Sequence, residues 1–218
     1  MILLAIDTAT ESCSAALWVD GKIFQKKTIK PRLHAELILP FVDDLLSQAN
    51  ILKSDIQGII VGQGPGAFTG VRIGVGVAQG LALALNVPVL AVSNLKTLAF
   101  TAYKKLNTNE KITILVATDA RMNEVYSAKY CIQGPIISQL TDEKVSSAND
   151  VDLNNIDAYI GSGFSVYPEL MDFSGTFKMD FKTNVYSQAQ YMLKMMADNF
   201  NELSTSIENI EPVYLRNP

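Results

Sequence analysis

The amino-acid sequence predicts an α/β protein of two related lobes, each with a mixed sheet flanked by helices. Both halves of the chain open in the same way. An apolar run, at residues 2–6 and again at 112–117, leads into a polar, acidic turn and then a hairpin. In the first half, further apolar runs alternate with long stretches of helical periodicity. The residues of the two halves differ too much to be called a repeat, so the duplication is expected in architecture only.

The first three strands are expected to form an antiparallel set. Residues 2–6 are all apolar and end in a polar segment, which is typical of a buried strand followed by a turn. Residues 15–19 and 22–28 flank Asp20-Gly21, which is a strong signal for a two-residue hairpin. The remaining elements expected in this half are a helix over 31–50 with Pro40 in its first turn or at a kink, a strand over 56–61, a helix from near Thr69 to Leu85, a strand over 87–92, and a helix from Ser93 to about Leu106.

The polar stretch 107–111 is the expected boundary between the lobes. We therefore predict an N-terminal lobe over 1–106 and a C-terminal lobe over 107–218, with a C-terminal tail that packs back on the N-terminal lobe. The elements expected in the second lobe are a strand over 112–117, a hairpin of 125–130 and 136–140 around Gly134-Pro135, a strand over 158–160 that ends in Gly161-Ser-Gly163, and a helix over 183–200.

The helix over 69–85 has its small residues in register. One column reads Gly70, Gly74, Ala78, Ala82, and a neighbouring column reads Gly76, Gly80, Ala84. Each glycine makes a helix less stable than alanine by roughly 0.8–1.0 kcal/mol, so we expect another backbone to approach the small-residue face closely. Val71, Val75, Leu81 and Leu85 supply the larger apolar groups expected against a sheet.

Composition limits the classes of function. The 218 residues carry a net charge of −4, which argues against a surface that grips nucleic acid directly. No run reaches the roughly 18 uncharged apolar residues of a membrane span, and residues 1–7 lack the basic region of an export signal. The two cysteines lie far apart without a partner motif, so we expect buried thiols in a reducing cytoplasm.

The glycine-rich turn before the helix matches neither standard nucleotide motif. A P-loop ends in Gly-Lys-Ser/Thr, whereas this chain has Gly70-Val-Arg. A dinucleotide fingerprint needs an acidic ribose ligand about 20 residues on, and no acid occurs between Asp55 and Glu110. A tight turn with close helix packing is the preferred interpretation.

His34 is the only histidine, and this count restricts the possible chemistry. A hydrolytic His-x-x-x-His metal site is excluded, and any Ser-His-Asp triad would have to use His34 in a chain without a Gly-x-Ser-x-Gly elbow. We therefore expect no metal site, no catalytic residue, and a helix-start or interface role for His34.

A nucleotide site is the remaining possibility. Asp7 and Thr8 could hold a metal-bound phosphate, while Asp119, Gly161 and Gly163 could contact a phosphate or an adenosine. Turns rich in Asp, Thr and Ser also form for local reasons, and that alternative is favoured on the residues alone.

Five motifs then occur in order across nearly the whole chain: Ala5-Ile-Asp-Thr-Ala-Thr10, His34-Ala-Glu36 with Leu39-Pro40, Gly64-Pro-Gly-Ala-Phe-Thr-Gly-Val-Arg-Ile-Gly74, Asp119-Ala-Arg-Met-Asn-Glu-Val-Tyr126, and Pro212-Val-Tyr-Leu-Arg216. With them the sequence closely resembles the bacterial TsaB family, also called YeaZ. The long glycine-rich string is the specific element of this resemblance.

The resemblance implies an actin/Hsp70/sugar-kinase-like (ASKHA) fold and a role in making threonylcarbamoyladenosine in tRNA. It implies a non-catalytic pseudoenzyme, because the related TsaD subunit performs the transfer and carries a histidine pair that this chain lacks. The implied partners are a TsaD-like transferase, a TsaE-like ATPase subunit and, in isolation, a second copy; tRNA is contacted only indirectly and no membrane is involved. No cofactor is intrinsic to the chain, and ATP or ADP at the complex interface is left open.

The family pairs through the first two helices of the N-terminal lobe, which coincide with the two helices singled out above. The residues predicted to bind the partner are Leu37, Phe41, Leu45, Gly70, Arg72, Gly74 and Ala78. An active ATPase or phosphotransferase of the same fold is the alternative, with Asp7, Asp119 and the Gly161-Ser-Gly163 loop around the nucleotide. A metallopeptidase would need a ligand set that the sequence does not offer.

Overall fold

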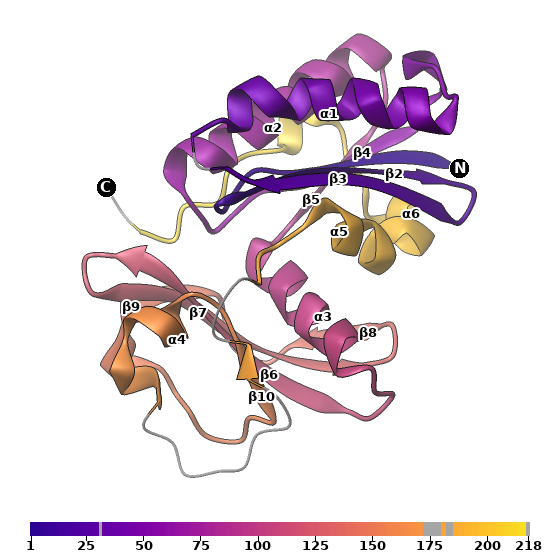
Figure 1. Ribbon diagram of the computed structural model, residues 1–218. Coiled ribbons are helices and arrows are strands. Elements are labelled where there is room, and N and C mark those ends of the chain that lie inside the picture. Colours follow the sequence, from indigo (N-terminus) through magenta and orange to yellow (C-terminus); the bar gives the residue numbers. More distant parts are fainter. Residues whose placement is uncertain (31, 172–179, 182–184, 217–218) are drawn as a thin grey trace. The chain divides into compact units, whose positions relative to one another are not determined.

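The computed structural model describes residues 1–30, 32–171, 180–181 and 185–216. The chain divides into two compact units, each with its own sheet and helices (Figure 1). The first unit consists of Met1–Asn94 and Ser187–Val213, and the second of Leu95–Tyr186 together with residues 214–216.

The sheet of the first unit is mixed and has the strand order β3-β2-β1-β4-β5. β1, β2 and β3 are antiparallel, while β4 and β5 run parallel to β1. The predicted hairpin is confirmed, since Asp20 and Gly21 join β2 to β3 with φ of 46° and 92°. The strands are β1 Ile2–Asp7, β2 Ser12–Val19, β3 Lys22–Ile29, β4 Gly58–Gly62 and β5 Val89–Val92.

Helices cover both faces of this sheet (Figure 1). On one face lie α1 (His34–Ala49) and α2 (Phe68–Leu85), and on the other lie α5 (Ala189–Met196) and α6 (Phe200–Leu203). Strand side chains alternate between the two: Leu4 and Ile6 are buried beneath α1 and α2, whereas Leu3 and Ala5 are buried beneath α5 and α6. Both faces of β1 are therefore apolar, which explains its unbroken apolar run.

Two of the helix predictions differ from the structure. α1 begins at His34, three residues later than expected, and Pro40 lies inside the helix beyond its first turn. Pro40 has no N–H to donate, so the carbonyl of Glu36 loses its partner in the helix ladder. The single helix expected over 183–200 is replaced by α5 and α6, which are separated by the 3-10 turn Ala197–Asn199; residues 183–184 lie outside the described residues.

The second unit repeats the strand arrangement of the first. Its sheet has the order β11-β10-β6-β7-β8. β6, β7 and β8 are antiparallel, and β10 and β11 run parallel to β6, so each of these five strands has a counterpart in the first unit with the same direction. The strands are β6 Ile112–Arg121, β7 Glu124–Gln133, β8 Ile136–Gln139, β9 Lys144–Ser147 (paired with β7), β10 Ala158–Ile160 and β11 Asp180–Phe181.

The repeated strand order confirms the predicted fold class, an ASKHA-like α/β fold of two related lobes with mixed sheets. The expected hairpin around Gly134-Pro135 is also confirmed, because this turn joins β7 to β8. The short helical segments of the structure are α4 Gly163–Val166 and the 3-10 turns Lys53–Asp55, Ala148–Asp150, Pro168–Met171 and Ile207–Asn209.

The division between the units differs from the predicted boundary after residue 106. α3 (Asn94–Leu106) buries Leu95, Leu98 and Tyr103 in the core of the second unit, together with residues of β6 and β7. The polar stretch 107–111 therefore only connects α3 to β6. Residues 187–213 group with the first unit, since α5 and α6 complete its core.

α2 is the one helix among the described residues that is long and apolar enough to cross a membrane by length and composition alone. Its mean hydropathy is 1.5 over 18 residues, although Arg72 and Gln79 interrupt it. Core helices of soluble proteins meet the same criterion. Only 28% of this stretch is buried, so a large part of an apolar helix faces outward.

The first small-residue column of α2 faces its own unit. Gly70 and Gly74 are buried against the turn that follows β1. A Cβ at Gly70 would lie 2.2 Å from the backbone oxygen of Thr8, and a Cβ at Gly74 would lie 2.6 Å from the Thr8 hydroxyl oxygen. The second column is different, because a Cβ at Gly76 would meet no atom within 4 Å. The expected close backbone approach thus occurs, but within the chain.

This contrast gives a prediction about stability. Gly70→Ala should lower the free energy of unfolding by about 1–3 kcal/mol, because the added carbon has no room beside the Thr8 backbone. Gly76→Ala should raise it by about 0.5–1 kcal/mol, because alanine is the better helix former and the space is open. Urea unfolding of both variants measures the difference. Shifts of the same sign and size would show that the Thr8 contact does not determine the residue at position 70.

Candidate functional site

An apolar strip of α2 faces away from the sheet. Phe68 is 58% exposed and Leu83 is 73% exposed, and Arg72, Gly76 and Gly80 are exposed beside them. The Arg72 guanidinium lies 3.4 Å from the centre of the Phe68 ring, so the cation covers one face of this aromatic. We call these five residues the exposed helix face.

Of the residues predicted to bind a partner, only some reach the surface. Arg72 is exposed, and Leu37 and Phe41 are partly buried on α1. Leu45, Gly70, Gly74 and Ala78 are buried in the core of the first unit, so the prediction that they contact a partner is corrected. These residues pack against the sheet and the turn after β1 of their own unit.

The signal that distinguishes the two columns was present in the sequence. Successive helix residues project about 100° apart, so Ala78 points within about 20° of Val71. Val71 is the residue expected against the sheet, and the first column therefore belongs to the same side. Gly80 projects about 180° from Val71, which places the second column outward.

The turn after β1 holds a buried carboxyl group. Asp7 is fully buried, and its Oδ1 accepts hydrogen bonds from the Ala9 N–H at 3.1 Å and from Asn94 Nδ2 at 2.9 Å. Asn94 also accepts a hydrogen bond from the Gly64 N–H at 2.8 Å and donates one to Ser187 Oγ at 3.0 Å. Asp7 Oδ2 is buried and has no hydrogen-bond partner among the described residues.

Burial raises the pKa of Asp7, because the interior disfavours the ionised form. The nearby polar groups of Ser187, Ala9 and Asn94 oppose this effect but do not cancel it. The neutral carboxyl group is therefore favoured over a wider pH range than in an exposed aspartate.

The glycine-rich loop and the start of α2 close over this turn. Thr8 Oγ1 donates a hydrogen bond to the carbonyl of Gly70 at 2.7 Å, and the Ala67 N–H donates one to the carbonyl of Ala9 at 2.8 Å. A Cβ at Gly66 would lie 2.3 Å from the same Ala9 oxygen. The structure thus places Asp7 and Thr8, two of the predicted nucleotide residues, in the interior of the first unit.

His34 belongs to the same turn. It is the first residue of α1, only 8% exposed, and its Nε2 lies 2.9 Å from the carbonyl oxygen of Thr10. In this geometry the ring N–H donates to the backbone and fixes the end of the turn. Among the described residues no group of three or more His, Cys, Asp or Glu side chains could hold a metal ion.

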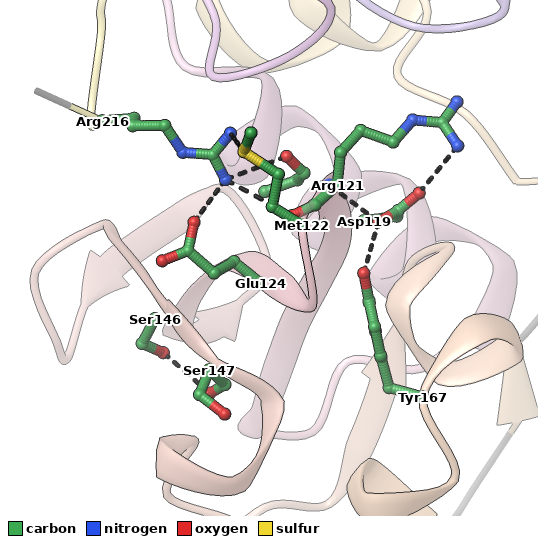
Figure 2. Close-up of polar contacts among 9 residues, drawn as sticks. Asp119, Arg121, Met122, Glu124, Ser146, Ser147, Tyr167 and Arg216 are labelled. Carbon is green, nitrogen blue, oxygen red and sulfur yellow. Dashed lines mark hydrogen bonds and ion pairs between the residues drawn. The ribbon is translucent and has the colours of Figure 1, made fainter. Parts of the chain in front are cut away.

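The second unit brings together the other predicted nucleotide residues. Asp119 Oδ1 accepts a hydrogen bond from the Tyr167 hydroxyl at 2.7 Å, and Oδ2 lies 3.3 Å from Arg121 Nη1 (Figure 2). The Asp119 N–H donates to Ser162 Oγ at 3.0 Å. Burial and the hydrogen bond to Asp119 raise the pKa of Tyr167, so its hydroxyl stays a donor.

An open cavity of about 590 Å³ lies beside this cluster. Its lining includes Arg121, Met122, Asn123, Val166 and Tyr167. The neighbouring glycines are used for packing, since a Cβ at Gly161 would lie 2.1 Å, and a Cβ at Gly163 2.9 Å, from the carbonyl oxygen of Ala117.

Comparison with known proteins gives consistent results. A family model described as TsaD, tRNA N6-adenosine threonylcarbamoyltransferase, matches residues 25–213. The tRNA threonylcarbamoyladenosine biosynthesis protein TsaB of Escherichia coli K12 is 39% identical, with 100% of this chain and 95% of the relative covered. The protein of the same name from Haemophilus influenzae is 33% identical, with 100% and 94% covered. The solved structure of YeaZ from Pseudomonas aeruginosa matches with a TM-score of 0.87 at 36% identity and covers 98% of this chain and 99% of that one.

The buried state of Asp7 gives a prediction about pH. Its folded-state pKa is raised above the ordinary 3.8, so the stability that it contributes is full below pH 3.8 and is lost as the pH rises through the folded-state value. Asp7→Asn cannot ionise, and its stability relative to the native chain should therefore increase from pH 4 towards pH 8. Urea unfolding across this range measures the change. If the free energies of unfolding of Asp7→Asn and the native chain instead differ by the same amount at every pH, the carboxyl group is not desolvated.

Proposed function

Since this chain belongs to the TsaB family of tRNA threonylcarbamoyladenosine biosynthesis proteins, we propose that it is a non-catalytic subunit of the machinery that makes this nucleoside. In this role it binds a TsaD-type transferase and stabilises it for catalysis. The match to a transferase family model supports a pair of related chains, because related folds can present equivalent helices to one another.

The exposed helix face is the observation that carries the proposal. Burial of apolar surface stabilises a complex by about 25 cal/mol per Å², and Phe68 and Leu83 leave much of their surface in water. Gly76 and Gly80 have open space in place of a side chain, which lets a second helix approach the backbone closely. We propose that the transferase covers this face and that a second copy covers it in isolation.

A membrane is a less suitable occupant of this face. The opposite side of α2 buries Val71 and Val75 in the core of the first unit, so the helix cannot leave the sheet without unfolding it. Arg72 and Gln79 also lie on the helix. A protein partner can accept these polar groups at its rim.

The non-catalytic role rests on the state of the residues that could react. His34, the only histidine of the chain, is bound to the Thr10 carbonyl, and Asp7 is sealed beneath the glycine-rich loop. This burial also gives less support to the alternative of an active ATPase or phosphotransferase, since Gly66 and Gly70 pack where a phosphate would approach the turn.

The remaining partners are proposed with this role. A net charge of −4 supports indirect contact with tRNA, with the phosphate contacts made by the transferase. We also propose that a TsaE-like ATPase subunit joins this assembly and that the assembly is cytoplasmic. Any ATP or ADP would then lie at the interface of the complex.

Co-purification with the TsaD-type transferase of the same organism tests the proposal. Leu83→Asp and Gly76→Leu should each weaken the complex at least about tenfold, because one places a charge and the other a bulky group in the interface. Both positions are exposed, so the melting temperature of the isolated chain should change little.

Leu140→Asp is the matched control, since Leu140 is 52% exposed in the second unit, outside the exposed helix face. It should leave the complex intact. Full retention of the transferase by Leu83→Asp and Gly76→Leu, or equal loss with all three variants, would contradict the proposed interface.

A further inference from the structure

The open cavity of the second unit already accommodates a guanidinium group from the chain itself. Figure 2 shows the Asp119 carboxylate between the Tyr167 hydroxyl and the Arg121 guanidinium. Its Oδ1 accepts two hydrogen bonds, from the Tyr167 hydroxyl at 2.7 Å and from the Arg121 N–H at 2.9 Å. Its Oδ2 lies 3.3 Å from Arg121 Nη1. Oδ2 is therefore the oxygen at which a cation contacts Asp119.

The ion pair between Asp119 and Arg121 is a weak one. Hydrogen bonds between a guanidinium and a carboxylate are usually about 2.7–2.9 Å long, so a distance of 3.3 Å leaves room for a closer donor. The Arg121 side chain is 81% exposed, and ion pairs at the surface add little to stability. A second cation can therefore replace Arg121 at Asp119, while Arg121 moves into water.

The charge of the cavity favours a cation over an anion. Asp119 and Glu169 are the acidic residues of its described lining and Arg121 is the basic one, so two negative charges and one positive charge leave a net charge of −1. The neighbouring Glu124 is neutralised by its ion pair with Arg216. A phosphate or carboxylate would meet repulsion from Asp119 and Glu169, because like charges brought together are unfavourable.

An apolar wall lines the same cavity. Met122 is 82% exposed and Val166 is 49% exposed, and Pro168 is also part of the lining. Met122 and Asn123 form the two-residue turn between β6 and β7, with φ of 57° and 62°. Such turns favour Asn, Asp or Gly, so the backbone gives no reason for a methionine here. An exposed methionine is suited to contact with a flexible apolar chain.

Arg216, also a residue of the second unit, holds this wall in place. Its Nη2 donates hydrogen bonds to the carbonyl oxygens of Ala120 at 3.1 Å and Arg121 at 3.3 Å. Its Nη1 lies 3.4 Å from the Met122 sulfur. The wall is therefore positioned before a ligand binds, which lowers the entropic cost of binding.

We propose that this cavity binds an arginine side chain presented by a segment of a partner protein. The guanidinium replaces Arg121 at Asp119 Oδ2, and Glu169 adds negative charge beside it. The aliphatic stem of the arginine lies along Met122 and Val166, since long basic side chains bury their stems on apolar surface. This site belongs to the second unit, whereas the exposed helix face belongs to the first.

A protein segment suits the cavity better than free arginine. The carboxylate of the free amino acid would be repelled by Glu169, whereas a peptide bond carries no charge at that place. The exposed side chains of Met122 and Val166 also offer contact to an apolar neighbour of the arginine in the segment.

Titration of the full chain with a peptide tests the site. The probe is a short peptide, capped at both ends, with one arginine between two leucines. It should bind at least about tenfold more tightly than the same peptide with neutral citrulline in place of arginine, because the charge-assisted pair is lost. The methyl signal of Met122, assigned by its loss in Met122→Asn, should shift on titration. The signals of Met192 and Met196, which are buried in the first unit, should not.

Two variants of opposite effect identify the bound charge. Asp119→Asn should weaken binding of the arginine peptide at least about tenfold, although asparagine keeps an oxygen that accepts from Tyr167. Arg121→Gln should tighten it at least about threefold, because the competing guanidinium is gone. Asp142→Asn is the matched control, since it makes the same change of charge at an exposed position of the second unit outside the lining, and it should leave the affinity unchanged.

Met122→Asn separates the wall from the fold. It should weaken binding at least about threefold while the melting temperature stays equal or rises, because asparagine suits the turn but has a shorter, polar side chain. Should Asp119→Asn fail to fold, Glu169→Gln at its exposed position should weaken binding in the same direction by less.

Four results would overturn the proposal. They are equal affinity for the arginine and citrulline peptides, equal loss with Asp142→Asn, unchanged affinity in Met122→Asn, and weaker binding in Arg121→Gln, which would mean that the cavity takes an anion through Arg121. Free arginine that binds as tightly as the capped peptide would overturn the docking of a protein segment.

Discussion

The close contact between the start of α2 and the turn after β1 is the constraint on which the first unit depends. Gly66 and Gly70 let two backbones meet at distances that no side chain would allow, and Thr8 bonds directly to the helix. This contact buries Asp7, fixes α2 on the sheet and sets which side of the helix faces outward. The glycine-rich string therefore acts inside the first unit. By fixing how α2 lies on the sheet, it also determines which residues form the exposed helix face.

The same five-strand order serves different purposes in the two units. In the first, the turn after the leading strand is buried, and burial raises the pKa of its Asp7 carboxyl group. In the second, the corresponding strand extends into a turn that stays open beside a cavity, with Asp119 paired to Arg121 and Tyr167. The two units thus share one strand order, while the turns after their leading strands differ in burial and in contacts.

Much of the fold could be predicted from the sequence because strands and hairpins leave strong local signals. The Asp20-Gly21 turn and the buried run of β1 are examples. The boundary between the units could not be predicted from the sequence. The polar stretch 107–111 resembles a linker, and only packing shows that α3 belongs to the second unit. The column of Gly70, Gly74 and Ala78, predicted to contact a partner, lies in the core, because it projects to the same side of α2 as Val71, and the helical spacing in the sequence already indicates this. The hydrogen bonds of Arg216 to the carbonyl groups of Ala120 and Arg121 join residues about 95 apart in sequence and leave no local pattern.

The discontinuous first unit affects the order in which the protein can fold during synthesis. Its sheet is complete once β5 has left the ribosome, yet Leu3, Ala5 and Ile60 stay uncovered until α5 and α6 emerge roughly a hundred residues later. The second unit is translated in between and has most of its core before that point. Nascent chains therefore carry an open apolar sheet for several seconds at ordinary elongation rates of about 5–20 residues per second, and a chaperone has this interval in which to bind it.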